Sequence, residues 1–105
     1  MVLMMITMWY PSSKTTEVSK KYFEIMKKFP AASFEKALVS AVKHDKKGVE
    51  IIGIAEIRKG KYEEAYNLNY KRMVEFHSIE GCEYKIETLL TFEESWALRG
   101  VVPPK

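Results

Sequence analysis

The sequence predicts an α+β domain with the element order β-α-β-β-α-β, followed by a short helix. Four stretches are rich in apolar and β-branched residues, and two stretches between them repeat apolar residues at helical spacing. The predicted strands are also apolar on both faces. In so small a domain the helices cover one face of the sheet, so the other face must meet water or a partner. Because that second face is too apolar for water, the sequence predicts sheet-to-sheet pairing with a second copy.

The first strand is predicted over residues 2–10 and ends at Pro11. Ser12 and Ser13 follow, and their hydroxyls are expected to cap a helix that ends before Pro30. That helix has one apolar stripe, formed by Val18, Tyr22, Ile25, Met26 and Phe29. The charged residues of the segment occupy its remaining surface, as in a helix that packs one side onto a sheet.

The second and third strands are predicted over residues 35–44 and 49–58, joined by a hairpin turn at 45–48. Gly53 and Ala55 share a parity, and their small size suits the face that the helices approach. The helix-free face of the third strand would then carry Ile52, Ile54, Glu56 and Arg58. By the same alternation, we expect Leu38, Ser40, Val42 and His44 on that face of the second strand.

A second helix is predicted over residues 61–79, ended by Gly81, and a fourth strand over 82–90. The inner stripe of this helix comprises Tyr62, Ala65, Tyr66, Asn69, Met73, Phe76 and Ile79. Thr91 and Glu94 then form a capping box, which starts a short helix that Gly100 stops. Trp96 lies on this last helix, and we expect it to pack onto the sheet edge or onto another subunit.

Length and composition indicate one soluble globular domain over residues 1–105, of which 91–105 form the C-terminal helix and tail. The net charge of +3 is mild and its lysines alternate with glutamates, so no nucleic-acid partner is expected. No apolar run is long enough to span a membrane, and the N-terminal run lacks the features of a signal peptide. A single cysteine, Cys82, fits a reducing cytoplasm.

The charged and amide residues are used unevenly. Asp45 is the one aspartate among 14 acidic residues, glutamine is missing, and Lys far outnumbers Arg. This composition is typical of proteins from hot environments. An AT-rich genome would enrich lysine in the same way, so both origins stay open.

The predicted element order corresponds to a ferredoxin-like arrangement with strand order 4-1-3-2. Two local features accompany it: Trp9-Tyr10-Pro11 closes the first strand, and residues 84–94 run from the last strand into an acidic, capped helix. With these features the chain resembles the dimeric α+β-barrel superfamily, and in particular its small uncharacterised members. The superfamily includes antibiotic-biosynthesis monooxygenases, muconolactone-isomerase-like proteins and stress-responsive barrel proteins. The resemblance implies the fold and a homodimer, or a ring of dimers, far more than it implies a reaction.

A ligand site is predicted at the mouth of the barrel, on the helix-free face. It combines an aromatic wall, an apolar floor and polar anchors, which is the usual make-up of a small-molecule pocket. The predicted lining consists of Trp9, His44, Ile52, Ile54, Glu56 and Glu87.

Two of these residues are candidates for catalysis. Glu56 interrupts an apolar strand, so it must be paired, hydrogen-bonded or protonated, and a raised pKa would make it a general base. Histidine is a common proton-transfer residue in enzymes, so His44 could play the same role. The structural alternatives are an ion pair of Glu56 with Arg58 or Lys85 and a surface position for His44.

The remaining candidate residues, which are the histidines and the cysteine, indicate neither a cofactor nor a metal site. Two histidines and one cysteine without ligand spacing do not indicate zinc, and Cys82 is expected to be an inert thiol. His77 as an axial haem ligand is conceivable in the superfamily, although no neighbouring residue supports it.

The function that the sequence favours is a homodimeric barrel that binds a small apolar ligand or serves a structural or accessory role. One alternative is a cofactor-independent monooxygenase or isomerase with Glu56 or His44 as general base. A haem-binding barrel and a ligand-sensing module are further alternatives, because fold alone does not fix function.

Overall fold

The structure is a computed structural model that describes residues 2–102 and 104. It has the order β1 (Val2–Tyr10), α1 (Thr15–Lys28), β2 (Glu35–Asp45), β3 (Gly48–Ile57), α2 (Tyr62–Val74), β4 (Glu83–Leu90) and α3 (Phe92–Leu98). Two short 3-10 turns, η1 (Ser12–Lys14) and η2 (Glu75–Ser78), precede α1 and follow α2. The four strands form one antiparallel sheet in the order β2-β3-β1-β4. The predicted α+β ferredoxin-like fold is therefore confirmed.

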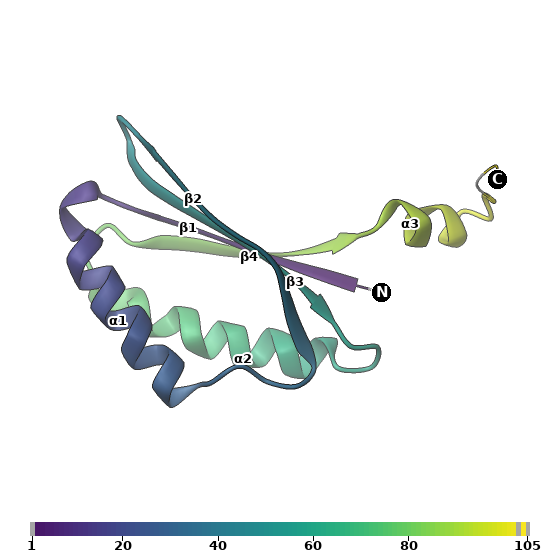
Figure 1. Cartoon of the computed structure of the whole chain (residues 1–105), viewed down its shortest axis with the longest axis horizontal. Helices are drawn as coiled ribbons and strands as arrows, with labels where there is room; N and C mark the ends of the chain where they lie inside the picture. Colours follow the sequence, from purple (N-terminus) through teal and green to yellow (C-terminus); the bar gives the residue numbers. More distant parts are fainter. Residues whose placement is uncertain (1, 103, 105) are drawn as a thin grey trace.

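Both long helices lie on the same side of the sheet, and the other side carries none (Figure 1). The side chains of β1 show which residues face the helices. Met4, Met8 and Tyr10 are buried in the core together with Val18 and Ile25 of α1. Successive strand residues alternate between faces, so the odd-numbered residues of β1 point to the opposite side, which we call the open face.

Two glycines position the start of α1. Gly48 has φ +128°, and a Cβ there would lie 2.6 Å from the carbonyl oxygen of Tyr10. Gly81 has φ +82°, and its Cβ would lie 2.7 Å from the Pro11 ring. No side chain fits at either position, so the hairpin turn and the α2–β4 connection both close tightly on Tyr10 and Pro11. The predicted hairpin turn between the second and third strands is confirmed.

The predicted serine caps of α1 are wrong. Residues 12–14 form the 3-10 turn η1, and α1 begins one residue later, at Thr15, without a side-chain cap. The Thr15 hydroxyl donates instead to the carbonyl oxygen of Ser12, at 2.7 Å. Pro11 sets the extended backbone that this turn needs, with φ −65° and ψ 145°.

The C-terminal helix α3 starts with the predicted capping box and ends at Leu98, and Gly100 follows with φ +72°. However, α3 lies beyond the end of the sheet, on the side where β1 begins, and does not fold back onto it (Figure 1). Phe92 and Leu98 are 79% and 77% exposed. The radius of gyration is 15.8 Å, against about 13 Å for a compact chain of this length. The projecting α3 is one reason for this difference.

Candidate functional site

The structure contains a cavity of about 490 Å³ between α1 and the sheet. This volume lies within the range of small-molecule sites. Its walls come from β1, α1, β3, α2 and the first half of β2. The apolar side chains that line it include Ile6, Met8, Val18, Ile25, Ile51, Met73 and Phe76. The cavity lies on the helix-covered face, whereas the sequence placed the site on the open face.

The cavity exists because α1 packs only part of its apolar stripe. Val18 and Ile25 are buried, which anchors the helix to the core. Tyr22, one turn from both anchors, and the adjacent Phe23 are 51% and 64% exposed and also line the cavity. Their rings contact each other edge to face, with centroids 6.1 Å apart. These two aromatic side chains therefore lie where the cavity opens to solvent.

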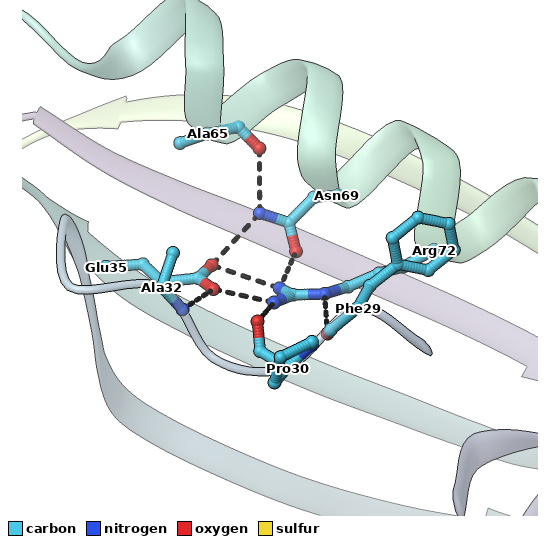
Figure 2. Close-up of polar contacts among 7 residues, drawn as sticks. All are labelled: Phe29, Pro30, Ala32, Glu35, Ala65, Asn69 and Arg72. Atoms are coloured by element: carbon cyan, nitrogen blue, oxygen red, sulfur yellow. Dashed lines mark hydrogen bonds and ion pairs between the residues drawn. The ribbon is translucent and has the colours of Figure 1, made fainter. Parts of the chain in front are cut away.

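A buried polar network forms one end of the cavity (Figure 2). Its centre is Arg72 of α2, which is 9% exposed. The Arg72 Nη1 atom donates to Glu35 Oε1 and to Asn69 Oδ1, each at 3.1 Å. Nη2 donates to Glu35 Oε2 and to the Pro30 carbonyl at 2.8 Å, and Nε donates to the Phe29 carbonyl at 3.1 Å. All five donors of the guanidinium group are used.

The Glu35 carboxylate is equally saturated. Oε1 accepts from Asn69 Nδ2 at 3.2 Å as well as from Arg72, and Oε2 accepts from the Ala32 amide at 3.1 Å as well as from Arg72. Asn69 in turn donates to the Ala65 carbonyl. Burial by itself raises the pKa of Glu35, but the Arg72 hydrogen bonds and charge, with the bonds from Ala32 and Asn69, lower it overall. Glu35 is thus held ionised and has no free lone pair for catalysis.

We call Glu35, Asn69 and Arg72 the clasp. It joins α2 to the connection between α1 and β2, because Arg72 also donates to the carbonyls of Phe29 and Pro30. Glu35 and Arg72 were not among the site residues predicted from the sequence. One signal was available for Arg72, because it lies one turn from Asn69 and from Phe76 on the inner side of a helix.

The predicted site residues lie mostly on the open face. Trp9 pairs with Glu50, and its indole Nε1 donates to Glu50 Oε1 at 2.8 Å. The Lys85 ammonium lies 5.9 Å from the centre of the Trp9 ring. It also lies 3.4 Å from Glu87 Oε1, an oxygen that is shielded from solvent and makes no hydrogen bond of good geometry. The indole therefore contacts one carboxylate and one ammonium group, and that ammonium group in turn approaches Glu87.

The register separates the two ends of the predicted site. Glu56 pairs with Leu3, whereas Trp9 lies six residues further along β1. At the rise of a strand, this places Glu56 and Trp9 about 20 Å apart. They share the open face, as predicted, but within one subunit they do not lie around one mouth. Ile52 and Ile54 lie between them, opposite Thr7 and Met5.

His44 lies on the other face of the sheet, so the prediction that it shares a face with Trp9 is wrong. It pairs with Val49, which is buried in the core beneath the helices. The cause is a bulge in β2: the register with β3 shifts between Ala37 and Val39. The extra residue reverses the alternation, so Ser40 and Val42 also turn to the helix side. Ligand binding by the predicted residues stays a prediction.

The other candidates occupy the edges of the domain. His77 stacks on Tyr84, and its Nε2 atom lies 3.1 Å from the tyrosine hydroxyl. Burial, followed by the nearby Tyr70 and Tyr66, raises the pKa of Tyr84. Burial also raises the pKa of the Cys82 thiol, which fits the expected inert cysteine.

No group of three or more metal-ligating side chains is found in the part of the chain that the structure describes. Within the same residues, none of the helices is long and apolar enough to cross a membrane.

Comparison with known proteins gives the fold alone. No family model matches the sequence, and no curated protein matches it. Among solved structures, the chain is similar to one from Deinococcus radiodurans that is assigned as an antibiotic biosynthesis monooxygenase. The TM-score is 0.57 at 9% identity, over 87% of this chain and 92% of that chain.

Two de novo designed proteins share the arrangement. Foldit4 aligns with a TM-score of 0.56 at 15% identity, over 86% of this chain and 96% of its own. Ferredog-Diesel aligns with a TM-score of 0.52 at 13% identity, over 83% and 84%. The chain therefore has the ferredoxin-like fold that these structures share. At these identities the likeness extends to the fold and no further.

Proposed function

We propose that this protein binds a small, mainly apolar molecule in the cavity between α1 and the sheet. The observation that supports it is the cavity itself: about 490 Å³, lined by aliphatic, methionine and aromatic side chains. In a protein of this size, side chains normally fill the core, because an empty cavity lowers the free energy of unfolding. The clasp and the tight contacts at Pro11 hold both ends of α1, so the helix bridges the space.

A fluorescence titration tests this function. The neutral probe 1-N-phenylnaphthylamine should bind the wild-type protein with a saturable rise in emission. Ala37→Phe, which adds a ring at a cavity-lining position of β2, should weaken binding about tenfold or more. Thr16→Phe adds the same ring on the exposed side of α1 and should leave binding unchanged. Equal binding by the wild type and Ala37→Phe would contradict the proposal.

We infer in addition that two copies pair through the open face. Its central rows contain Met5, Ile52, Ile54 and Val39, and Val39 is 42% exposed. A stable contact of this kind covers about 800 Å² on each partner. Ile54→Lys would place an unpaired charge in that contact and should yield monomers in light scattering. A wild-type protein that is monomeric at micromolar concentration would contradict the dimer.

The enzymatic alternative stays a prediction. Glu56 and His44 lie on opposite faces of the sheet, and neither lines the cavity. Glu35, which does line it, is committed to the clasp. Tyr10 also lines the cavity, but burial raises its pKa, so its hydroxyl stays protonated and is a poor general base.

A further inference from the structure

The charges that line the cavity between α1 and the sheet cancel each other. Among the described residues of its lining, the charged ones are Glu35 and Arg72. They form one bidentate pair, in which both side chains are 10% exposed. The cavity is therefore lined by two opposite charges that contact each other, and its lining has no net charge.

An arginine at the end of an apolar cavity is well suited to hold an anionic ligand, because its donors bind a carboxylate or a sulfonate at two points. Arg72 has no donor left for this role, since all five of its N–H groups are bound within the protein (Figure 2). An anion that entered would have to displace one of these partners or lie unpaired beside the Glu35 carboxylate. Both cost free energy, because a buried charge without a partner is unfavourable.

A cationic ligand meets the same obstacle at Glu35. Each oxygen of this carboxylate already accepts two hydrogen bonds. The capacity that the clasp has left is uncharged: among the described residues, the Asn69 Oδ1 atom accepts from Arg72 only. An amide oxygen can accept a second hydrogen bond, so this atom suits a neutral O–H or N–H group of a ligand.

The remaining polar side chains of the lining are hydroxyl groups. They belong to Tyr10 of β1, to Ser19 and Tyr22 of α1, and to Ser40 of β2. None of these four hydroxyls makes a hydrogen bond within the part of the chain that the structure describes. A hydroxyl group can donate and accept without carrying a charge, so it suits the polar groups of an uncharged molecule.

We propose that the clasp makes this cavity selective for uncharged molecules. The ligand is a neutral, mainly apolar compound with hydroxyl, carbonyl or uncharged N–H groups, and the ionised form of the same compound is rejected. This inference rests on the ligand-binding function proposed above. It makes Glu35 a specificity-determining residue, because its carboxylate neutralises the Arg72 cation at the end of the cavity.

Two dyes with the same rings test this selectivity. The probe 1-N-phenylnaphthylamine is uncharged, and 8-anilinonaphthalene-1-sulfonate adds one sulfonate to it. In fluorescence titrations at pH 7, the wild type should bind the neutral dye about thirtyfold or more tightly than the sulfonate dye. Sulfonate-dye emission that persists in Ala37→Phe comes from outside the cavity and is subtracted.

Any apolar surface prefers the neutral dye to some extent, so the decisive comparison is between variants. The ratio of the two dissociation constants, sulfonate dye over neutral dye, is measured for each. Glu35→Gln removes the carboxylate charge beside Arg72 and should lower this ratio about tenfold or more. Glu75→Gln is the matched control: it makes the same change in net charge at the ion pair with Lys28, outside the cavity, and should leave the ratio unchanged.

A second variant avoids any change in the clasp, in case circular dichroism shows that Glu35→Gln does not fold. Ser40→Lys adds a cation without a committed partner at an exposed, cavity-lining position of β2. It should also lower the ratio about tenfold. Thr16→Lys adds the same charge on the exposed side of α1, away from the lining, and should not.

The outcomes separate the two proposals. If the neutral dye does not bind the wild type, the ligand-binding function itself fails. If the neutral dye binds in the cavity but the sulfonate dye binds there equally well, the selectivity for uncharged molecules is overturned. If folded Glu35→Gln and Glu75→Gln give the same ratio, the clasp does not determine the selectivity and the inference is overturned as well.

Discussion

Arg72 and Glu35 form a bidentate ion pair, with Nη1 3.1 Å from Oε1 and Nη2 2.8 Å from Oε2. Both side chains are 10% exposed. The pair ties α2 to the start of β2, and the remaining Arg72 donors hold the carbonyls of Phe29 and Pro30, where α1 ends. It therefore fixes the position of the α1 end that borders the cavity. Two residues that lie 37 positions apart in sequence thus help to define the proposed ligand site.

Breaking the clasp should destabilise the fold more than breaking an exposed pair of the same length. Arg72→Met leaves Glu35 buried without its partner and should cost about 3–5 kcal/mol in the free energy of unfolding. The double variant Arg72→Met, Glu35→Met should recover part of this loss, because no uncompensated charge remains. Chemical denaturation measures both values.

Lys28→Met is the control for this experiment. Lys28 and Glu75 also approach to 2.8 Å, but their side chains are 63% and 31% exposed. Removing that pair should change stability little. Equal losses for Arg72→Met and Lys28→Met would contradict a buried clasp.

The clasp should weaken in acid. The folded pKa of Glu35 lies below its ordinary value of 4.5, so the ionised carboxylate stabilises the fold fully above that value. This contribution is lost as the pH falls through the folded pKa. Denaturation of the wild type and Glu35→Gln at pH 7, 5, 4 and 3 should show a stability difference that shrinks below pH 4.5. A difference that stays constant down to pH 3 would contradict the prediction.

Cys82 should react slowly. Burial raises its pKa, and the thiolate is the reactive form. Ellman's reagent at pH 7 should modify the folded protein about tenfold more slowly than free cysteine, and denaturant should remove the difference. A folded protein that reacts as fast as the free thiol would show that Cys82 is accessible and activated.

The sequence was sufficient for the fold because its signals were local. The apolar and β-branched runs of the strands, the hairpin turn before Gly48 and the Thr91–Glu94 capping box each depend on neighbours in the chain, and all are present. The prediction of which β2 residues lie on the open face was wrong, because a bulge after Ala37 reverses the alternation of side chains. No glycine or proline in the sequence marks the position of this bulge. The clasp and the cavity could not be predicted from the sequence for another reason. Both depend on how α1 and α2 pack against elements that are distant in the sequence.

The most direct test of the ligand site compares methyl groups on the two faces of the sheet by NMR. Ile51 and Met73 line the cavity, whereas Met5 and Ile54 lie on the open face. Titration with 1-N-phenylnaphthylamine should shift the methyl resonances of Ile51 and Met73 and leave those of Met5 and Ile54 in place. Shifts confined to Met5 and Ile54 would move the site to the open face and contradict the cavity between α1 and the sheet as the binding site.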